Sequence, residues 1–101
     1  PKVAFAEAVE QSNQSITVGA FAKILYDRDG IAMGRNTMFK WLRDQKLLDK
    51  YNYPYQQYMN AGYFQVAEVI RNGQPHMVPF ITGKGQLYLA KKLMERAYVS
   101  Q

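Results

Sequence analysis

The chain has 101 residues, the length of one small domain, and 48% of them are apolar, which is enough to bury a single hydrophobic core. It contains no cysteine and one histidine, so a disulfide framework and a zinc site of cysteine and histidine ligands are excluded. Thirteen Lys and Arg against eight Asp and Glu give a formal net charge of +5, which favours a polyanionic partner without specifying it. No apolar run approaches the roughly 20 residues needed to cross a bilayer, and we expect residues 1–101 to form one domain with no membrane role.

A helix, a short strand and a second helix are predicted for the first 25 residues. The apolar positions of Val3–Gln11 are compatible with a first helix. A polar break follows, after which Ser15–Thr17 is long enough for one short strand. Val18–Leu25 then predicts a helix, for which Thr17 is a suitable N-cap. The apolar face expected for this helix consists of Gly19, Ala20, Phe21, Ala22, Ile24 and Leu25.

The segment Tyr26–Gly30 predicts a turn that ends this helix. Its Asp-x-Asp-Gly pattern is similar to the start of a calcium-binding loop, which needs further oxygen ligands and a Glu at its twelfth position. Here Ile31 occupies the fifth position and Met38 the twelfth. We therefore interpret the segment as a turn with solvated charges.

The segment Gly34–Lys46 predicts the central amphipathic helix of the chain. Asn36, Lys40 and Arg43 recur at i, i+4 and i+7, which makes its outer face polar and basic. With the preceding helix and a connection that contains glycine, it has the outline of a helix-turn-helix, in which it would be the recognition helix. The residues expected on its buried face are Met38, Phe39, Trp41 and Leu42.

Tyrosines are concentrated in the segment that follows, Tyr51–Gly62. Pro54 near its start and Gly62 at its end are typical of a short helix with proline in its first turn. Aromatic side chains can form stacking platforms for nucleic-acid bases, and tyrosines can also cover the edge of a core with their hydroxyl groups in water. We favour the second interpretation for Tyr51, Tyr53, Tyr55 and Tyr58.

The next segment predicts a β-hairpin. Tyr63–Ile70 is rich in strand formers, Asn72-Gly73 is a strong turn signal, and Met77–Ile81 returns as the second strand. The loop between the strands would span Arg71–His76. Because Pro79 cannot donate a hydrogen bond to a ladder, we expect the returning strand to lie at a sheet edge or to carry a break there.

The last predicted element is a helix from Gly83 to about Tyr98 with Thr82 as its N-cap. Gly83-Lys84-Gly85 could also hold a phosphate on free N–H groups. Because this segment lacks the spacing of a P-loop or dinucleotide fingerprint, we favour a simple capped start. We expect Leu87, Ala90, Leu93, Met94 and Ala97 to face the core, and Lys84, Lys91, Lys92 and Arg96 to face water.

The predicted order is helix, short strand, helix, helix, hairpin, helix. It corresponds to a mainly α fold with a small β-hairpin (α+β), winged helix-turn-helix-like with an added C-terminal helix. The predicted loop Arg71–His76 would form the tip of the wing. The chain shows no internal repeat and no linker that would divide it into two domains.

Five short motifs point to one phage family. They are Gly34-Arg35-Asn36, Phe39-x-Trp41-Leu42-Arg43, Pro54-Tyr55-Gln56-x-Tyr58, Ala61-Gly62-Tyr63-Phe64 and Thr82-x-Lys84-Gly85-Gln86-x-Tyr88. Through them the chain resembles, over nearly its whole length, the C-terminal domain of phage antirepressors, also called the KilA C-terminal domain. The resemblance implies a bacteriophage or prophage regulator in the cytoplasm of the bacterial host. It also implies a variable N-terminal module before this domain, which agrees with a sequence that starts at Pro1.

The resemblance implies DNA binding and a role in opposing a prophage repressor. We therefore expect double-stranded DNA as a partner, read by the outer face of the central helix. Asn can make two hydrogen bonds to adenine and Arg two to guanine, so Arg35, Asn36 and Arg43 are the expected base readers. The full set of expected DNA-binding residues is Arg35, Asn36, Thr37, Lys40, Arg43, Lys46, Arg71 and Lys84.

The alternative is a protein-interaction module that binds a phage repressor through the same surface, since a basic helix suits an acidic patch. A third interpretation is that these charged side chains only keep an exposed helix face in contact with water and bind no partner. A homo-oligomer is compatible with any of these interpretations. Catalysis is not expected, because the chain has no cysteine nucleophile and no carboxylate pair in an acid/base motif. No metal or small cofactor is expected either.

Overall fold

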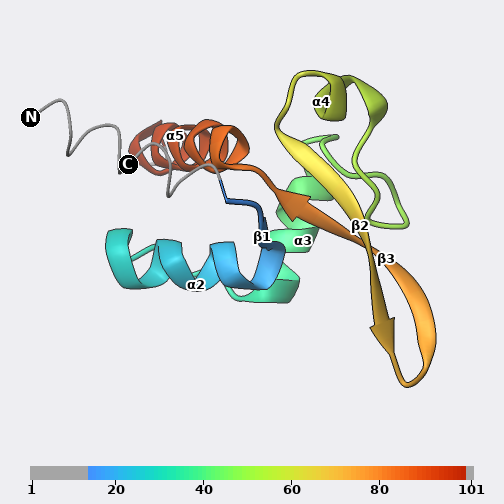
Figure 1. The fold of residues 1–101 in the computed structure, drawn as a ribbon. Helices are drawn as coiled ribbons and strands as arrows, with labels where there is room; N and C mark the ends of the chain where they lie inside the picture. The colour runs from blue at the N-terminus through green and yellow to red at the C-terminus, as the bar shows by residue number, and fades with distance from the viewer. Residues whose placement is uncertain (1–13, 100–101) are drawn as a thin grey trace, which may run out of the picture.

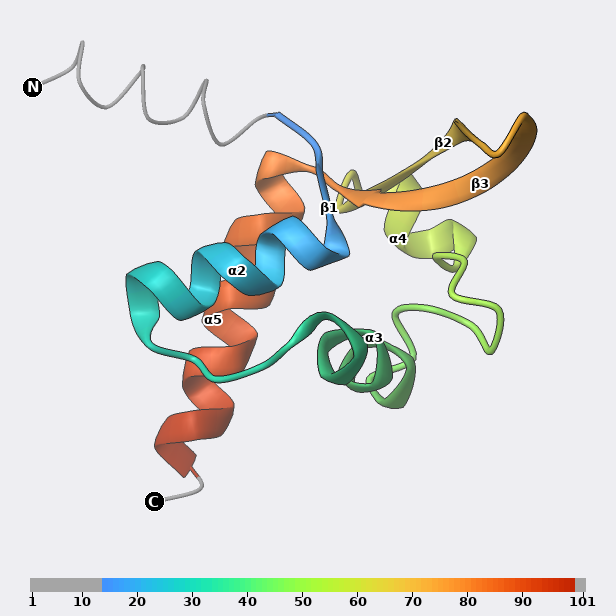
Figure 2. The same cartoon turned by 90° about the horizontal axis from the view of Figure 1, so that it is seen from below.

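The computed structural model describes residues 14–99, and within that part the chain has four helices and one three-stranded antiparallel sheet (Figure 1). Helix α5 lies across α2, and the β2–β3 hairpin extends away from the helices (Figure 1 and Figure 2). This is a small α+β fold, as predicted. The helix expected at Val3–Gln11 lies outside the described residues. The elements are β1 (Ile16–Thr17), α2 (Val18–Asp29), α3 (Arg35–Asp44), α4 (Gln56–Asn60), β2 (Phe64–Arg71), β3 (Gln74–Ile81) and α5 (Gly83–Val99).

Helix α2 begins where the sequence predicts, but it continues past the predicted end at Leu25 to Asp29. The hydroxyl oxygen of Thr17 accepts a hydrogen bond from the N–H of Ala20 at 3.1 Å, which satisfies a free donor of the first turn. At the other end Gly30 has a left-handed backbone (φ 69°), and its N–H donates to the carbonyls of Leu25 and Tyr26. Glycine adopts this conformation without strain. The segment predicted as a turn is thus the end and the cap of the helix.

One hydrophobic core joins α2, α3, the sheet and α5. The predicted buried face of α3 is confirmed, and Trp41 within it is only 5% exposed. In α2 the prediction is partly wrong, because Ala20 and Ile24 are exposed. The residues buried in these two helices are Val18, Phe21, Ala22 and Leu25 in α2, and Met38, Phe39, Trp41 and Leu42 in α3.

The β2–β3 hairpin is confirmed, but β2 is shifted by one residue and β3 begins at Gln74 instead of Met77. Asn72 (φ 52°) and Gly73 (φ 75°) both have positive φ, as a two-residue type I′ turn requires. The twist of such a turn matches that of the strands, so pairing continues up to Arg71 and Gln74. The predicted loop Arg71–His76 is therefore wrong, and most of it belongs to the strands.

The position of Pro79 agrees with its missing donor. The strand order is β1-β3-β2, which places β3 in the middle of the sheet. However, β1 pairs only with Phe80 and Ile81, so among the described residues β3 has β2 as its only strand neighbour at Pro79. This part of β3 is effectively an edge, where proline is tolerated.

Helix α5 is rotated relative to the predicted arrangement. Leu87 and Met94, which were expected in the core, are 63% and 50% exposed, whereas Leu89 is fully buried. A Cβ at Gly85 would overlap the carbonyl oxygen of Tyr63, so the backbone of α5 lies very close to the residue that precedes β2. This close approach sets the rotation of the helix.

Residues that follow Gly85 at intervals of four lie on the same face of α5, and Leu89 and Leu93 are accordingly buried. The predicted N-cap is confirmed, because the hydroxyl oxygen of Thr82 accepts a hydrogen bond from the N–H of Gly85 at 2.9 Å. The same hydroxyl donates to the carbonyl of Gly62 at 2.5 Å and so links α5 to the start of β2. The side chains of Arg96 and Ala97 lie outside the described part.

Helix α4 is shorter than predicted, and the tyrosines around it are more exposed. Pro54 precedes the helix and forms an isolated β-bridge with Leu48 instead of lying in the first turn. Tyr58 packs against the core, as expected. The expectation is wrong for the three others, because Tyr51, Tyr53 and Tyr55 are 68%, 41% and 43% exposed.

Candidate nucleic-acid interface

The outer face of α3 presents the polar side chains of Asn36, Thr37 and Lys40, all of them exposed. Arg35 lies at the start of this helix, with its guanidinium 4.7 Å from the centroid of the Phe39 ring. Its aliphatic part lies close to Gly19 of α2, where an added Cβ would be 3.3 Å from Cδ of Arg35. Packing against both helices thus holds Arg35 in position.

A groove of about 190 Å³ lies between α3 and the hairpin; we call it the α3–hairpin groove. Arg71 and His76 are diagonal neighbours on one face of the hairpin, because Val69 pairs with His76 and Arg71 with Gln74. Both line this groove opposite Arg35. The described residues that line it include no acidic side chain. They are Arg35, Phe39, Tyr51, Asn52, Arg71, His76, Met77, Val78 and Pro79.

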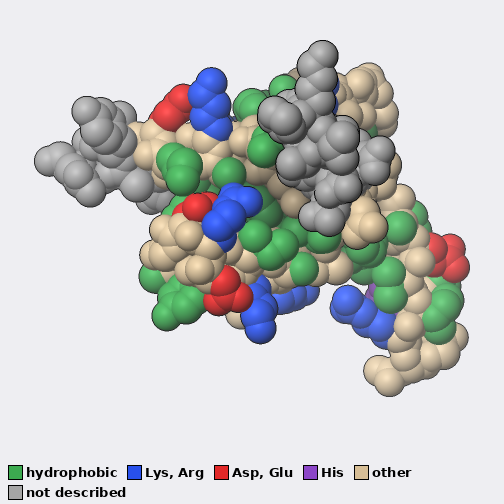
Figure 3. Space-filling view, turned by 60° about the vertical axis from the view of Figure 1, so that its left-hand side comes forward, with side chains coloured by type: hydrophobic (Ala, Val, Ile, Leu, Met, Phe, Trp, Pro, Cys, Tyr) green, Lys and Arg blue, Asp and Glu red, His purple; other side chains and the backbone are tan. Residues whose placement is uncertain are grey.

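Lys and Arg side chains gather on both sides of a hollow between the helical body and the hairpin (Figure 3). The two arginines that line the groove, Arg35 and Arg71, come from α3 and from the hairpin, which are distant in the sequence. With no carboxylate among the described lining residues to compensate them, Arg35 and Arg71 create a positive potential in the groove. The fold therefore brings two of the predicted DNA-binding residues together.

Arg43 is placed differently from the prediction. It was expected to project freely from the outer face of α3, but it is half-buried, and its Nη1 donates a hydrogen bond to Oδ1 of Asn52 at 2.6 Å. Asn52 has a positive φ of 69°, a conformation that asparagine tolerates better than most residues. One donor of the guanidinium is thus engaged within the protein, and among the described residues the other donors have no partner.

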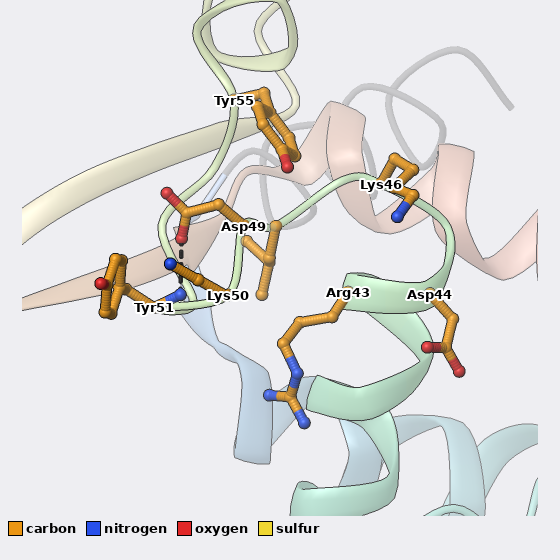
Figure 4. A pocket seen from close by; sticks show the side chains of 8 residues that line it. Arg43, Asp44, Lys46, Asp49, Lys50, Tyr51 and Tyr55 are labelled. Atoms are coloured by element: carbon orange, nitrogen blue, oxygen red, sulfur yellow. Dashed lines mark hydrogen bonds between the residues drawn. The ribbon is translucent and has the colours of Figure 1, made fainter.

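Lys46 is exposed and lies in the turn that follows α3, with a positive φ of 63°. It lines a second groove, of about 490 Å³, together with Arg43 and the loop that carries the exposed tyrosines (Figure 4). We call it the tyrosine-loop groove. Its lining residues are Arg43, Asp44, Lys46, Leu48, Asp49, Lys50, Tyr51 and Tyr55.

Comparison with known proteins gives the family. The model of the Phage antirepressor protein KilAC domain matches residues 1–96. The chain belongs to this family. This chain is 38% identical over 103 residues to Protein kilA of Escherichia phage P1, and this match covers 94% of the chain and 36% of that protein. It is 42% identical over 74 residues to Antirepressor protein 1 of the same phage, covering 69% of the chain and 21% of that protein.

The family resemblance predicted from the five motifs is thus confirmed. The chain spans little more than a third of Protein kilA and about a fifth of Antirepressor protein 1. No solved structure matches this chain.

Lys84 lies apart from the other predicted residues of the KilAC domain. Its Nζ donates a hydrogen bond to the carbonyl of Ala61 at 2.8 Å and lies 5.3 Å from the centroid of the Tyr63 ring. It lines neither groove. Together with the Thr82 cap, this contact supports the capped helix start that the sequence favours over a phosphate loop.

Sequence reasoning missed the three other polar residues that line the α3–hairpin groove, namely Tyr51, Asn52 and His76. A signal for His76 existed, because a two-residue Asn-Gly turn places it on the same face of the hairpin as Arg71. Tyr51 and Asn52 had no such signal, since their position depends on how the loop after α3 folds back. Within residues 14–99, no three His, Cys, Asp or Glu residues cluster as metal ligands would. No helix in that range combines the length and apolar character needed to cross a membrane.

Proposed function

We propose that this KilAC domain is a DNA-binding regulatory module of a phage antirepressor. In this proposal the fold is a winged helix-turn-helix, α3 is the recognition helix and the β2–β3 hairpin is the wing. The observation that carries it is the α3–hairpin groove, where Arg35 of the helix and Arg71 of the hairpin face one space. Two cationic elements distant in the sequence meet there, which suits a polyanion that contacts both.

The order of the elements supports this proposal. Helix α2 packs against α3, and the connection Gly30–Gly34 between them is short. In a helix-turn-helix, the second helix enters the major groove and the first crosses the DNA backbone. The outer face of α3 is exposed and polar, so it is available for that role. The hairpin follows the recognition helix in the chain, and residues of both elements line the α3–hairpin groove.

The side chains divide into two roles in this proposal. Arg35 and Asn36 read base edges, because Arg pairs with guanine and Asn with adenine through two hydrogen bonds each. Lys46 and Arg71 contact phosphates, which position the protein without reading sequence. Thr37 and Lys40 lie between these groups on the exposed face of α3. Arg43 contributes through the donors that Asn52 leaves free.

A salt titration with duplex DNA tests the proposal. The affinity of the domain should fall linearly with the logarithm of salt concentration, and Arg71→Ala should weaken binding and lower the salt slope by about one. Lys91→Ala is the matched control, because Lys91 is exposed on α5 and lines neither groove. The absence of salt-dependent duplex binding by the unaltered domain would disprove the proposal.

A second candidate function is binding of a phage repressor protein through the same surface. The similarity to Antirepressor protein 1 favours it. Either role is regulatory rather than enzymatic, as the antirepressor family suggests. If Arg71→Ala left duplex binding unchanged and abolished association with the repressor, this second function would replace the first.

A further inference from the structure

Three aromatic side chains are exposed on one loop that follows α3. Tyr51, Tyr53 and Tyr55 are 68%, 41% and 43% exposed, although burying a tyrosine ring normally contributes substantially to stability. Apolar surface that stays exposed in a cluster commonly marks an interaction site. The tyrosines alternate with Asn52 and Pro54 in this loop, and each ring carries a polar hydroxyl group, so the cluster is amphipathic rather than purely apolar.

The loop is held in a defined shape by hydrogen bonds. The carboxylate of Asp49 accepts from the N–H groups of Tyr51 at 2.8 Å and Tyr53 at 3.0 Å. The N–H of Asp49 donates in turn to the carbonyl of Tyr53 at 2.8 Å. Arg43 ties the loop to α3 through Asn52. A ligand would therefore meet tyrosines that are already in place, which lowers the entropic cost of binding.

The tyrosine-loop groove is large enough for a small ligand. Its volume of about 490 Å³ is comparable with ligand sites, which measure about 300–1,000 Å³. The ring of Tyr55 borders it on one side, Arg43 and Asp44 of α3 border it on another, and Lys46 closes one end (Figure 4). An aromatic face and cationic side chains thus border the same space.

The charges of the groove favour an anion weakly. The lining has three cationic side chains and two carboxylates, which leaves one net positive charge. The cations are Arg43, Lys46 and Lys50, and the carboxylates are Asp44 and Asp49. The Asp49 carboxylate is engaged by two backbone N–H groups and is thereby partly compensated. Attraction by charge alone would be modest, so stacking on an aromatic ring has to supply much of the affinity.

The two grooves adjoin each other. Tyr51 lines both of them, and the Arg43–Asn52 pair joins one residue of each. A nucleic-acid strand that lies along the α3–hairpin groove could therefore continue into the tyrosine-loop groove. This continuity favours a nucleic acid over a protein as the occupant.

We propose that the tyrosine-loop groove binds an unpaired nucleotide of single-stranded DNA. Its base stacks on the ring of Tyr55, and the adjacent phosphates lie near Lys46 and the free donors of Arg43. Bases inside a duplex are already stacked on each other, so only an unpaired base offers its face to a tyrosine. Basic grooves lined with aromatic rings are typical of proteins that bind single strands without sequence preference. This site goes beyond the duplex binding proposed above, and its choice of a nucleic acid as the occupant rests on that proposal.

The experiment measures the fluorescence anisotropy of a labelled thymidine oligonucleotide of about 12 nucleotides, a length within the usual range for single-strand sites. Tyr55→Ala should weaken binding about fivefold to a hundredfold, the loss expected for one stacked base. Tyr55→Phe should bind like the unaltered domain, because it keeps the ring. Tyr53→Ala is the matched control, since Tyr53 is exposed on the same loop and does not line the groove.

The possible outcomes separate this site from the proposed duplex binding. The proposed site would be overturned if Tyr55→Ala and Tyr55→Phe lost oligonucleotide affinity equally. It would also be overturned if neither variant lost affinity. Failure of the unaltered domain to bind the oligonucleotide would also overturn it, whatever its duplex affinity. If Tyr55→Ala instead lost association with a repressor protein and kept its oligonucleotide affinity, the loop would be a protein contact. A separate titration with a fully paired duplex should show little change for Tyr55→Ala.

Discussion

Nη1 of Arg43 donates a hydrogen bond to Oδ1 of Asn52 at 2.6 Å, and this contact ties the end of α3 to the loop that follows it. The bond is partly buried, and Asn52 reaches it with a left-handed backbone. Arg43 therefore has a structural role in addition to any contact with DNA. Its substitution will report on both roles, so a loss of binding by an Arg43 variant cannot be assigned to base reading alone.

A double-mutant cycle measures this structural role. Arg43→Ala and Asn52→Gly should each lower the free energy of unfolding, with a coupling of about 0.5–1.5 kcal/mol, the net value of a hydrogen bond. Glycine is chosen at position 52 because it tolerates the positive φ and removes the acceptor together with the rest of the side chain. Urea unfolding of the four proteins gives the coupling. Strictly additive losses would mean that the bond contributes nothing in solution.

Trp41 should be the most sensitive position of α3. It is 5% exposed, and Trp41→Ala should cost about 3–5 kcal/mol of a total of about 5–15 kcal/mol. Trp41→Phe should cost less, because Nε1 of Trp41 is buried without a hydrogen-bond partner in the part of the chain that the structure describes. Urea unfolding followed by circular dichroism measures both. A native fluorescence spectrum typical of a fully exposed tryptophan would contradict the assignment.

Gly85→Ala tests the packing that sets the rotation of α5. The added Cβ would overlap the carbonyl oxygen of Tyr63 and touch Ile81, so the helix has to move away from the sheet. Overpacking of this kind typically costs about 1–3 kcal/mol, and more where the backbone cannot yield.

Gly34→Ala is the control for this substitution. Nothing described lies within 4 Å of a Cβ at Gly34, and its φ of −75° is open to any residue. Its cost should stay below about 1 kcal/mol, the loss of a favourable N-cap residue. Equal denaturation midpoints for the two variants would show that α5 does not pack closely at Gly85.

Features set by neighbouring residues could be predicted from the sequence. The buried face of α3 follows from its periodicity, the cap of α2 from Thr17, and the hairpin turn from Asn72-Gly73. Each of these depends on a few consecutive residues, whose preferences agree with the fold.

Features that depend on contacts between distant segments could not be predicted in this way. The rotation of α5 is set where Gly85 meets Tyr63, so Leu87 and Met94 were assigned to the wrong face. The candidate site shows the same division. The exposure of Asn36 and Lys40 was predicted from their spacing on α3, whereas the bond from Arg43 to Asn52 appears only once the loop has folded back.

The outer face of α3 yields the last prediction, which separates base reading from phosphate contact. Asn36 and Lys46 are both exposed, so Asn36→Ala and Lys46→Gln should change the melting temperature little. Loss of a base-reading contact at Asn36 should cost about 1–3 kcal/mol of binding free energy, mainly on the preferred duplex. Loss of the Lys46 charge should instead weaken binding to all duplexes alike and lower the salt slope by about one. Titrations against a preferred and a random duplex at several salt concentrations distinguish these patterns. If both variants bound every duplex like the unaltered domain, α3 would not be the recognition helix.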